Sequence, residues 1–290
     1  MHVIATAGHV DHGKSTLIRA LTGIETDRWE EEQRRGLTID LGFAWCTLPS
    51  GREVSFVDVP GHERFIGNML AGLGPVPIVL FVVAADEGWS AQSSDHRDAV
   101  KALGISHGII VITRADRAPE RVEAVIDEAR RELAETGLAD APACGVSGIT
   151  GEGIDELRRV LDELVASVSA ASPHESVRLW IDRSFTIDGA GTVVTGTLGA
   201  GTVRPGDDLT LVSTRHGGAV PRTVSVRGVQ SRGMREDVVE PVSRAALNLR
   251  QIPASDIHRG DVLLTPGAFH LTRVVDVRSV SGCLLYTSPS

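Results

Sequence analysis

The sequence predicts an α/β domain with a mostly parallel sheet, followed by a small β-barrel and the start of a second barrel. Two observations support this fold class. Up to about residue 166, short apolar runs alternate with amphipathic helical patterns, as in doubly wound α/β domains. From Val177 onward, short strand-like runs are separated by Gly, Pro and Asp, which is typical of a barrel.

The first domain is predicted to hold four buried parallel strands, because four runs are β-branched and nearly continuous in apolar character. These runs are HVIATAG (2–8), VSFVDV (54–59), IVLFVVAA (78–85) and HGIIVIT (107–113). Helical spacing follows in LIRALTGI, in Val122 to Leu133 and in Ile154 to Leu164. The alternation of strand and helix is the basis for placing one domain at residues 1–166.

The second part of the chain begins after SVSAASPHE, a small and polar stretch that predicts a linker at 167–175. The barrel is expected at 176–267, with strands in VRLWIDRSF, GTVVTGTL, PGDDLTLV, RTVSVRGV and GDVLLTP. Residues 268–282 are interpreted as the start of a third domain that is cut short. The last eight residues, CLLYTSPS, resemble the translation of a sequencing-library adapter, so we hypothesise that 283–290 is a non-native tail.

Bulk composition excludes several classes of protein. No apolar run approaches the roughly 20 residues of a membrane span, and no basic n-region follows Met1, so a cytoplasmic location is expected. Cys46, Cys144 and Cys283 lie far apart, which indicates neither disulfides nor a zinc site. The net charge is −9, with 27 acidic against 16 basic residues in 1–173. Any RNA contact would therefore need a local basic patch or a preorganised pocket.

A phosphate-binding loop is predicted between the first strand and the first helix. Gly8-x4-Gly13-Lys14-Ser15 has the required spacing and context. The backbone N–H groups would surround the phosphates, Lys14 would reach the β and γ phosphates, and Ser15 would offer a hydroxyl to Mg²⁺. The predicted nucleotide-binding residues here are Gly8, His9, Val10, Asp11, His12, Gly13, Lys14, Ser15 and Thr16. His9 and His12 lack a third ligand at a suitable spacing, so loop packing is expected for them.

Two further segments are predicted to respond to the γ-phosphate. Asp58, in DVPGH at the end of the second strand, would hold Mg²⁺ through its water, and Gly61 would donate its N–H to the γ-phosphate. Thr38, in RRGLTID, would add a second hydroxyl to the metal. The predicted metal ligands are thus Ser15, Thr38 and Asp58. Loss of the γ-phosphate would release both segments, which makes them switches.

The base-binding residues are expected after two later strands. Asp116, in TRADR, would accept from the ring N–H and exocyclic amine of guanine, a donor pair that adenine lacks. The usual guanine-reading sequence is Asn-Lys-x-Asp, so Thr113 and Arg114 depart from it, although Arg114 could stack over the base. Ser147, Gly148 and Ile149 complete the predicted site. GTP or GDP is the expected ligand, and Thr113 is expected to weaken guanine specificity because it offers fewer hydrogen bonds than an amide.

These motifs together resemble the translational GTPases. The resemblance rests on GHVDHGKST, RRGLTIDLGF, DVPGHERFIGNML, TRADR and DRSFTIDGAGTVVTGTL, and it extends from residue 1 to about 280. Within the family, TDRWEEEQRRGLTIDLGFAW and IDRSFTIDGAGTVVTG are most similar to the SelB group of selenocysteine-specific elongation factors. The resemblance implies that 1–166 is a GTP-binding domain and 176–267 a translation-factor domain 2. It further implies a monomer that hydrolyses GTP on the ribosome and delivers selenocysteyl-tRNA at recoded UGA codons.

The resemblance also implies roles for individual residues. His62 would position the attacking water, between the apolar side chains of Val10 and Ile39; the implied catalytic residues are His62, Thr38, Lys14 and Gly61. Phe43, Asp182 and Arg244 would form the aminoacyl pocket, where a fixed guanidinium favours a selenolate. The modules with which this family binds an mRNA hairpin do not occur in this sequence, so that partner is implied only through domains outside it.

Three alternatives stay open from the sequence. The chain could carry an ordinary aminoacyl-tRNA as another translational GTPase. It could be a phosphate-loop kinase, although the barrel supplies neither an acceptor site nor a lid. It could also be a regulatory GTP-binding module with negligible turnover, because His62 alone does not establish hydrolysis.

Overall fold

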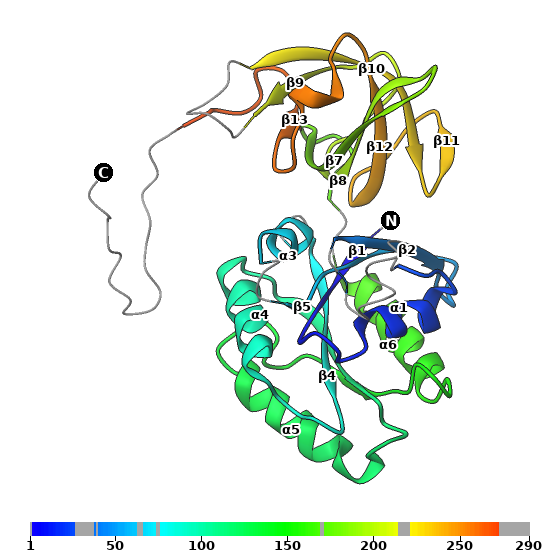
Figure 1. Ribbon diagram of the computed structural model, residues 1–290, viewed down its shortest axis with the longest axis vertical. Coiled ribbons are helices and arrows are strands. Elements are labelled where there is room, and N and C mark those ends of the chain that lie inside the picture. The colour runs from blue at the N-terminus through cyan, green and yellow to red at the C-terminus, as the bar shows by residue number, and fades with distance from the viewer. Residues whose placement is uncertain are drawn as a thin grey trace, which may run out of the picture.

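The computed structural model describes residues 2–26, 38, 40–62, 66–73, 76–168, 171–213 and 221–272. Two lobes stand one above the other in Figure 1, an α/β lobe and an all-β lobe. The α/β lobe is built on a six-stranded sheet with the order β2-β3-β1-β4-β5-β6. The parallel strands are β1 (His2–Ala7), β3 (Glu53–Asp58), β4 (Ile78–Ala84), β5 (His107–Thr113) and β6 (Ala143–Gly145). The four predicted strands are confirmed.

Of the other two strands of this sheet, the edge strand was not predicted, and β6 was expected only as the strand that precedes Ser147. β6 has only three residues, too few for a pattern to emerge, and β2 (Gly42–Thr47) pairs antiparallel with β3 at the sheet edge. Only alternate side chains of β2 are buried in its first half, so it lacks the continuous apolar run of the central strands. This edge strand carries Phe43 to the rim of the lobe.

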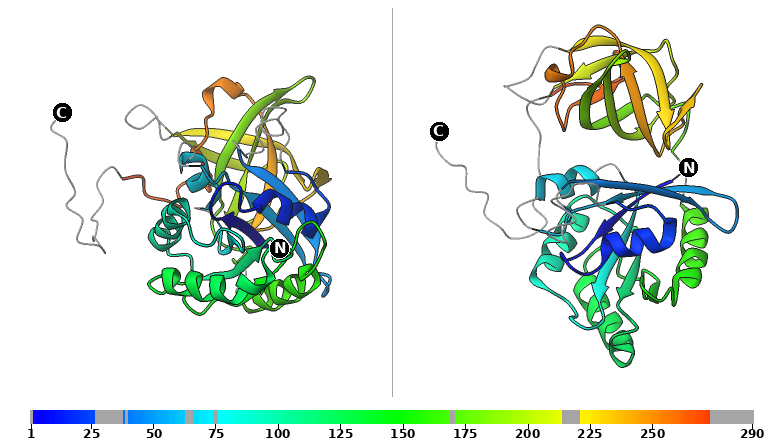
Figure 2. Two further views of the ribbon diagram at one scale, coloured as in Figure 1. Left: turned by 60° about the horizontal axis from the view of Figure 1, so that its bottom comes forward. Right: turned by 45° about the vertical axis from the view of Figure 1, so that its right-hand side comes forward.

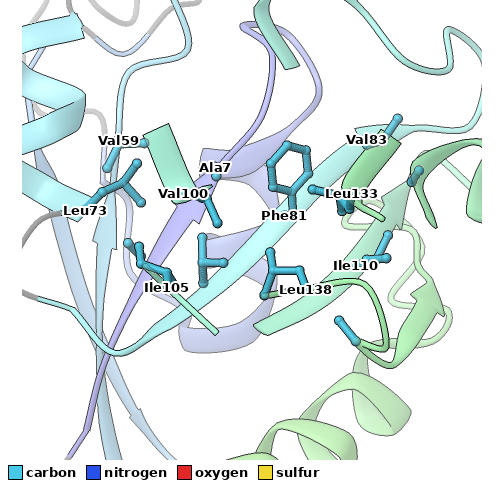
Figure 3. Close-up of a cluster of buried hydrophobic side chains, with 14 of the residues drawn as sticks. Ala7, Val59, Leu73, Phe81, Val83, Val100, Ile105, Ile110, Leu133 and Leu138 are labelled. Atoms are coloured by element: carbon cyan, nitrogen blue, oxygen red, sulfur yellow. The ribbon is translucent and has the colours of Figure 1, made fainter. Parts of the chain in front are cut away.

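Helices cover both faces of the sheet. α1 (Lys14–Thr22) and α6 (Ile154–Ser167) bury Leu17, Ile18, Leu157 and Leu161 against one face. On the other face lie α3 (Ile66–Leu73), α4 (Ala91–Ala102) and α5 (Val122–Leu133), with a short 3-10 turn, η2 (Pro119–Arg121), before α5. Figure 3 shows this second cluster, in which Phe81 of β4 lies among aliphatic side chains from several helices and strands. The helical periods predicted for 122–133 and 154–164 match α5 and α6.

The all-β lobe is a closed barrel. Its strands are β7 (Arg178–Ile187), β8 (Gly191–Ala200), β9 (Asp208–Val212), β10 (Arg222–Ser231), β12 (Ser243–Leu249) and β13 (Val262–Leu264), and pairing of β9 with β10 closes it. β11 (Met234–Glu236) extends one edge and η3 (Ala254–Asp256) is a 3-10 turn. All five predicted strand segments lie in this barrel. β12 was missed because SRAALNL contains no β-branched or aromatic residue.

The lobes are joined by the segment between α6 and β7. α6 ends at Ser167 and Val168 is still buried in the α/β core, so the predicted linker, 167–175, starts within the last turn of the helix. Figure 2 shows the two lobes from two further directions. The predicted tail at 283–290, and most of the segment 268–282, lie outside the described residues. No helix in the described part of the chain is long and apolar enough to span a membrane.

Candidate nucleotide site and interdomain pocket

The predicted phosphate loop lies between β1 and α1. Gly8 has a φ of 130°, and a Cβ there would meet the Val82 carbonyl oxygen at 2.1 Å, so no other residue fits. Gly13, at φ 78°, precedes the first turn of α1, where backbone N–H groups have no intrahelical partner. The Lys14 ammonium is buried and donates to the carbonyl oxygens of Gly8 at 3.0 Å and His9 at 2.7 Å. The loop thus has the form that a phosphate requires.

Oxygen ligands suited to Mg²⁺ lie at the start of α1. The Ser15 and Thr38 hydroxyls are 2.9 Å apart, which unites two of the three predicted metal ligands. Asp58 is fully buried, and its two carboxylate oxygens accept hydrogen bonds from Thr6 at 2.8 Å and Thr26 at 2.9 Å. Hydroxyls and a carboxylate are the hard donors that Mg²⁺ takes, so these residues fit the metal. Thr6 and Thr26 were not predicted from the sequence.

The second predicted switch packs directly on the phosphate loop. A Cβ on Gly61 would lie 2.3 Å from the Val10 nitrogen and 2.5 Å from the Lys14 ammonium, so only glycine allows this approach. His62 follows and is partly buried. Ile39, expected to flank it together with Val10, lies outside the described residues. Gly61, Lys14 and Val10 are therefore brought together as expected.

The TRADR segment contacts the phosphate loop as well as the expected base site. The Thr113 hydroxyl donates to the His12 carbonyl oxygen at 2.6 Å, so it holds the loop. Arg114 adopts φ 55°, and its guanidinium pairs with Asp86 at 3.1 Å and Glu87 at 2.6 Å. Because the guanidinium is bound there, only the methylene groups of Arg114 are available to a base. The Asp116 carboxylate is exposed.

The loop after β6 adjoins the N-terminal part of α1. Ser147 is fully buried, and its hydroxyl accepts from the backbone N–H groups of Ile149 at 3.3 Å and Thr150 at 3.1 Å. Gly148 lies against Thr16, where an added Cβ would come within 3.0 Å of the methyl carbon. Ile149 is 73% exposed, which leaves its side chain at the surface. The ends of β5 and β6 thus meet α1 at one edge of the sheet, as parallel strands require.

His9 and His12 have a third potential metal ligand that sequence spacing did not reveal. Glu87, from the loop after β4, brings its carboxylate to a cluster in which the three ligand atoms lie within 4.8 Å of one another. However, Glu87 is already paired with Arg114. Burial, followed by the charge of His9, lowers the pKa of His12 to about 4, so this ring is neutral. Loop packing remains the prediction for His9 and His12. The structure adds a neighbouring carboxylate, Glu87, that the sequence spacing did not reveal.

Two side chains of α4 also hold the phosphate loop. The Val10 N–H donates to Gln92 Oε1 at 3.3 Å, and the Gly8 N–H donates to His96 Nδ1 at 3.1 Å. Sequence reasoning missed both residues, because their partners lie 82 and 88 positions away and no local motif marks them.

Two of the predicted aminoacyl residues, Phe43 and Arg244, line a cavity between the lobes, and Asp182 adjoins it through its ion pair with Arg244. The Arg244 guanidinium lies 3.9 Å from the centre of the Phe43 ring and forms an ion pair with Asp182. Thr197 accepts from Arg244 at 2.9 Å, and Thr195 donates to Asp182 at 2.7 Å, so both charged groups are further held by hydroxyls. The cavity has a volume of about 290 Å³.

A second arginine, Arg183, was not predicted and also lines this cavity. Its guanidinium lies 5.2 Å from the centre of the Phe43 ring and donates to the Leu41 carbonyl oxygen at 2.6 Å. It pairs with Asp40 at 2.9 Å, and Arg259 pairs with the same carboxylate. Burial would raise the pKa of Asp40, but hydrogen bonding from Arg259 and the charge of Arg183 hold it below its ordinary value. The pocket therefore presents two guanidinium groups held in place, each paired with a carboxylate.

Comparison with known families matches both lobes. The model described as elongation factor Tu GTP binding domain matches residues 1–167, and the one described as elongation factor Tu domain 2 matches residues 191–264. These ranges follow the division into an α/β lobe and a barrel.

Curated relatives and a solved structure agree with the family models. The chain is 40% identical over 276 residues to the selenocysteine-specific elongation factor of Desulfomicrobium baculatum, covering 95% of this chain and 43% of the relative. It is 43% identical over 264 residues to that of Escherichia coli, covering 90% and 42%.

A crystal structure of a bacterial selenocysteine-specific elongation factor superposes with a TM-score of 0.84 at 37% identity, over 92% of this chain and 45% of the other. The chain therefore spans less than half of the length of these relatives. The α/β lobe with its phosphate loop and the barrel that follows it together place this chain in the elongation factor Tu family of GTP-binding proteins.

Proposed function

We propose that this chain is the nucleotide- and cargo-binding part of a selenocysteine-specific elongation factor. It binds GTP, hydrolyses it on the ribosome and delivers selenocysteyl-tRNA to recoded UGA codons in the cytoplasm. Recognition of an mRNA hairpin would belong to domains outside this sequence. The assignment rests on the selenocysteine-specific elongation factors described above, of which the chain covers less than half.

The observation that carries the proposal is the charge of the interdomain cavity. Arg244 lies over Phe43 and is held by Asp182, and Arg183 lies over the same ring. A selenol is largely ionised near neutral pH. A serine hydroxyl is neutral there, and a cysteine thiol is mostly protonated. Fixed guanidinium groups in a partly buried pocket therefore favour the selenolate. Asp182 would orient Arg244 or receive the ammonium of the aminoacyl group.

A neighbouring cavity is suited to the nucleoside that carries the amino acid. It has a volume of about 310 Å³ and shares Gln230 and Ala246 with the first cavity. Ile187 and Val193 supply apolar surface there, and Asn248 and Arg227 supply polar groups. An aminoacyl ester places its ribose and base within a few ångströms of the side chain, so adjoining cavities for the two parts are what this ligand requires.

The nucleotide site supports GTP hydrolysis by positioning and electrostatics. Lys14 and the N–H groups at the start of α1 would bind the phosphates, and Gly61 would donate its N–H to the γ-phosphate. Ser15, Thr38 and Asp58 would hold Mg²⁺, which neutralises charge on the phosphates when bound. His62, directly after Gly61, would orient the attacking water. Asp116 would read guanine, with Thr113 stabilising the loop and not the base.

The proposal is tested by protection of the aminoacyl ester against hydrolysis. With GTP bound, we expect the protein to protect selenocysteyl-tRNA strongly and the same tRNA carrying serine weakly. Arg244→Ala should reduce protection of the selenocysteyl ester about tenfold or more, because a charge-assisted contact is lost. Arg222→Ala is the matched control, since Arg222 pairs with Asp256 on the exposed surface of the same barrel.

Each outcome separates one alternative. Equal protection of both esters would move the assignment to a general translational GTPase. Protection of neither ester, with GTP still bound and hydrolysed, would indicate a GTPase that does not carry this tRNA. GTP binding without ribosome-stimulated turnover would favour a regulatory module.

A further inference from the structure

Helix α4 bears a buried histidine that contacts the phosphate loop. His96 is 3% exposed, and its Nδ1 accepts a hydrogen bond from the Gly8 N–H at 3.1 Å. Gly8 has no freedom to move away, because its backbone already lies against the Val82 carbonyl group. The imidazole therefore defines where the phosphate loop begins.

The same ring also contacts the segment that is expected to sense the γ-phosphate. The Gly61 backbone acts on the pKa of His96 and favours the charged ring, so the imidazole also lies within reach of this segment. Because Nδ1 accepts from Gly8, the neutral ring carries its proton on Nε2, which can donate to a carbonyl oxygen. Burial, followed by the charge of Lys14, lowers the pKa of His96 to about 3, so the ring stays neutral at physiological pH. One neutral imidazole thus spans the two loops between which the phosphates would lie.

Gln92, one helical turn before His96, is hydrogen-bonded to the phosphate loop. Its Oε1 accepts from the Val10 N–H at 3.3 Å. With the amides of Gly8 and Val10 bound to α4, the amides at the N-terminus of α1 remain for phosphate oxygens. The difference between the two side chains matters, because His96 lies within reach of both loops and Gln92 is hydrogen-bonded to the phosphate loop.

We propose that His96 is a positioning residue that sets the spacing between the phosphate loop and Gly61 and thereby favours a nucleoside triphosphate over a diphosphate. The proposal rests on the nucleotide site proposed above. Gly61 can donate its N–H to a γ-phosphate only when this group lies at the correct distance from the loop that binds the β-phosphate. His96 would set that distance through the backbone groups of Gly8 and Gly61.

The test compares the dissociation constants of GDP and of a non-hydrolysable GTP analogue, with Mg²⁺ present, for wild type and variants. In His96→Ala we expect affinity for the GTP analogue to fall about tenfold more than affinity for GDP, because Gly61 loses its support. His96→Asn should recover part of the difference, since a carboxamide can accept from one backbone group and donate to another. Gln92→Ala should weaken both nucleotides alike. His107→Ala, an exposed residue at the start of β5, should leave both constants unchanged.

The outcomes separate a positioning role from a structural one. Equal loss of GDP and GTP-analogue affinity in His96→Ala and His96→Asn would overturn the inference, as would no loss in either. If His96→Ala does not fold, His96→Asn decides alone, together with the imidazole ¹⁵N shifts of wild type. Those shifts should report a protonated Nε2 and an unprotonated Nδ1; the opposite tautomer would contradict the hydrogen bond from Gly8. Failure of wild type to bind either nucleotide would instead overturn the proposed function, and this inference with it.

Discussion

At the scale of single residues, two histidines of the α/β lobe have pKa values far below 6.5. His12 titrates at about 4 and His96 at about 3, in both cases chiefly because burial disfavours the charged ring. His12 lies in the phosphate loop and His96 beneath it. Protonation of either ring would place a charge in a buried site, so the folded protein excludes the proton that the unfolded chain accepts.

The stability of the protein should therefore fall as the pH is lowered from 6.5 to 5. In this window the unfolded chain binds more protons than the folded one, so the free energy of unfolding decreases with decreasing pH. The expected loss at pH 5 is on the order of 2 kcal/mol for each histidine. Urea unfolding at pH 7, 6 and 5 measures it.

The variants assign this effect to the buried rings. His96→Asn should remove about half of the pH dependence. His107→Asn, on an exposed histidine, should retain all of it. A free energy of unfolding that does not change between pH 7 and pH 5 would contradict the burial of neutral rings.

At the scale of elements, strand β5 depends on a glycine that no turn explains. Gly108 lies within the strand and pairs with Val79 of β4. A Cβ there would come within 2.5 Å of the Val79 carbonyl oxygen and within 2.9 Å of a methyl group of Leu138. The loop after α5 therefore packs onto β5 at a distance that only glycine permits.

Gly108→Ala should destabilise the protein by about 1–3 kcal/mol, because the added methyl group must displace either backbone or a buried leucine. Gly67→Ala is the matched control. Nothing lies within 4 Å of a Cβ at that helical position of α3. Alanine there should be neutral or stabilise the helix by up to about 1 kcal/mol. Thermal and urea unfolding measure both, and a Gly108→Ala variant as stable as wild type would show that β5 and Leu138 are less closely packed.

At the scale of the whole molecule, charged contacts connect the two lobes near both switches. Asp40, two residues after Thr38, binds Arg183 and Arg259 of the barrel, and Arg259 also donates to Asn68 of α3. Arg232 of the barrel pairs with Glu53 of β3. Since Arg183 also lies over Phe43, a movement of the segment around Asp40 would be transmitted to the interdomain cavity.

Asp40→Asn should loosen the contact between the lobes. The side chains involved are 21–29% exposed, so the loss is expected on the order of 1–3 kcal/mol, and the two lobes should unfold in separate calorimetric transitions. Asp256→Asn, which breaks an ion pair within the barrel, should keep the transition of wild type. An Asp40→Asn protein that melts like wild type would exclude this network as the main coupling between the lobes.

The sequence alone determined the features that depend on local pattern. Four buried strands, three helices and five barrel segments follow from the period of apolar residues and from turn residues between them. The phosphate loop was also readable, because its glycines, Lys14 and Ser15 must be consecutive to surround a phosphate. Thr38, Asp58 and Asp116 were identifiable by their place at strand ends or within short motifs, and the pocket residues by family resemblance.

Only the tertiary structure decided the contacts between distant segments. Thr6 and Thr26 hold Asp58, Glu87 joins the two histidines of the phosphate loop, and Arg183 and Arg259 meet at Asp40. Thr113 binds the phosphate loop, and Arg114 binds Asp86 and Glu87. Thr6, Glu87 and Arg259 stand in no motif, and the motifs that hold the other residues do not reveal these partners. A hydrogen bond or an ion pair requires proximity in space and sets no spacing along the chain. His96 is the clearest case: its imidazole supports the phosphate loop from a helix 88 positions away.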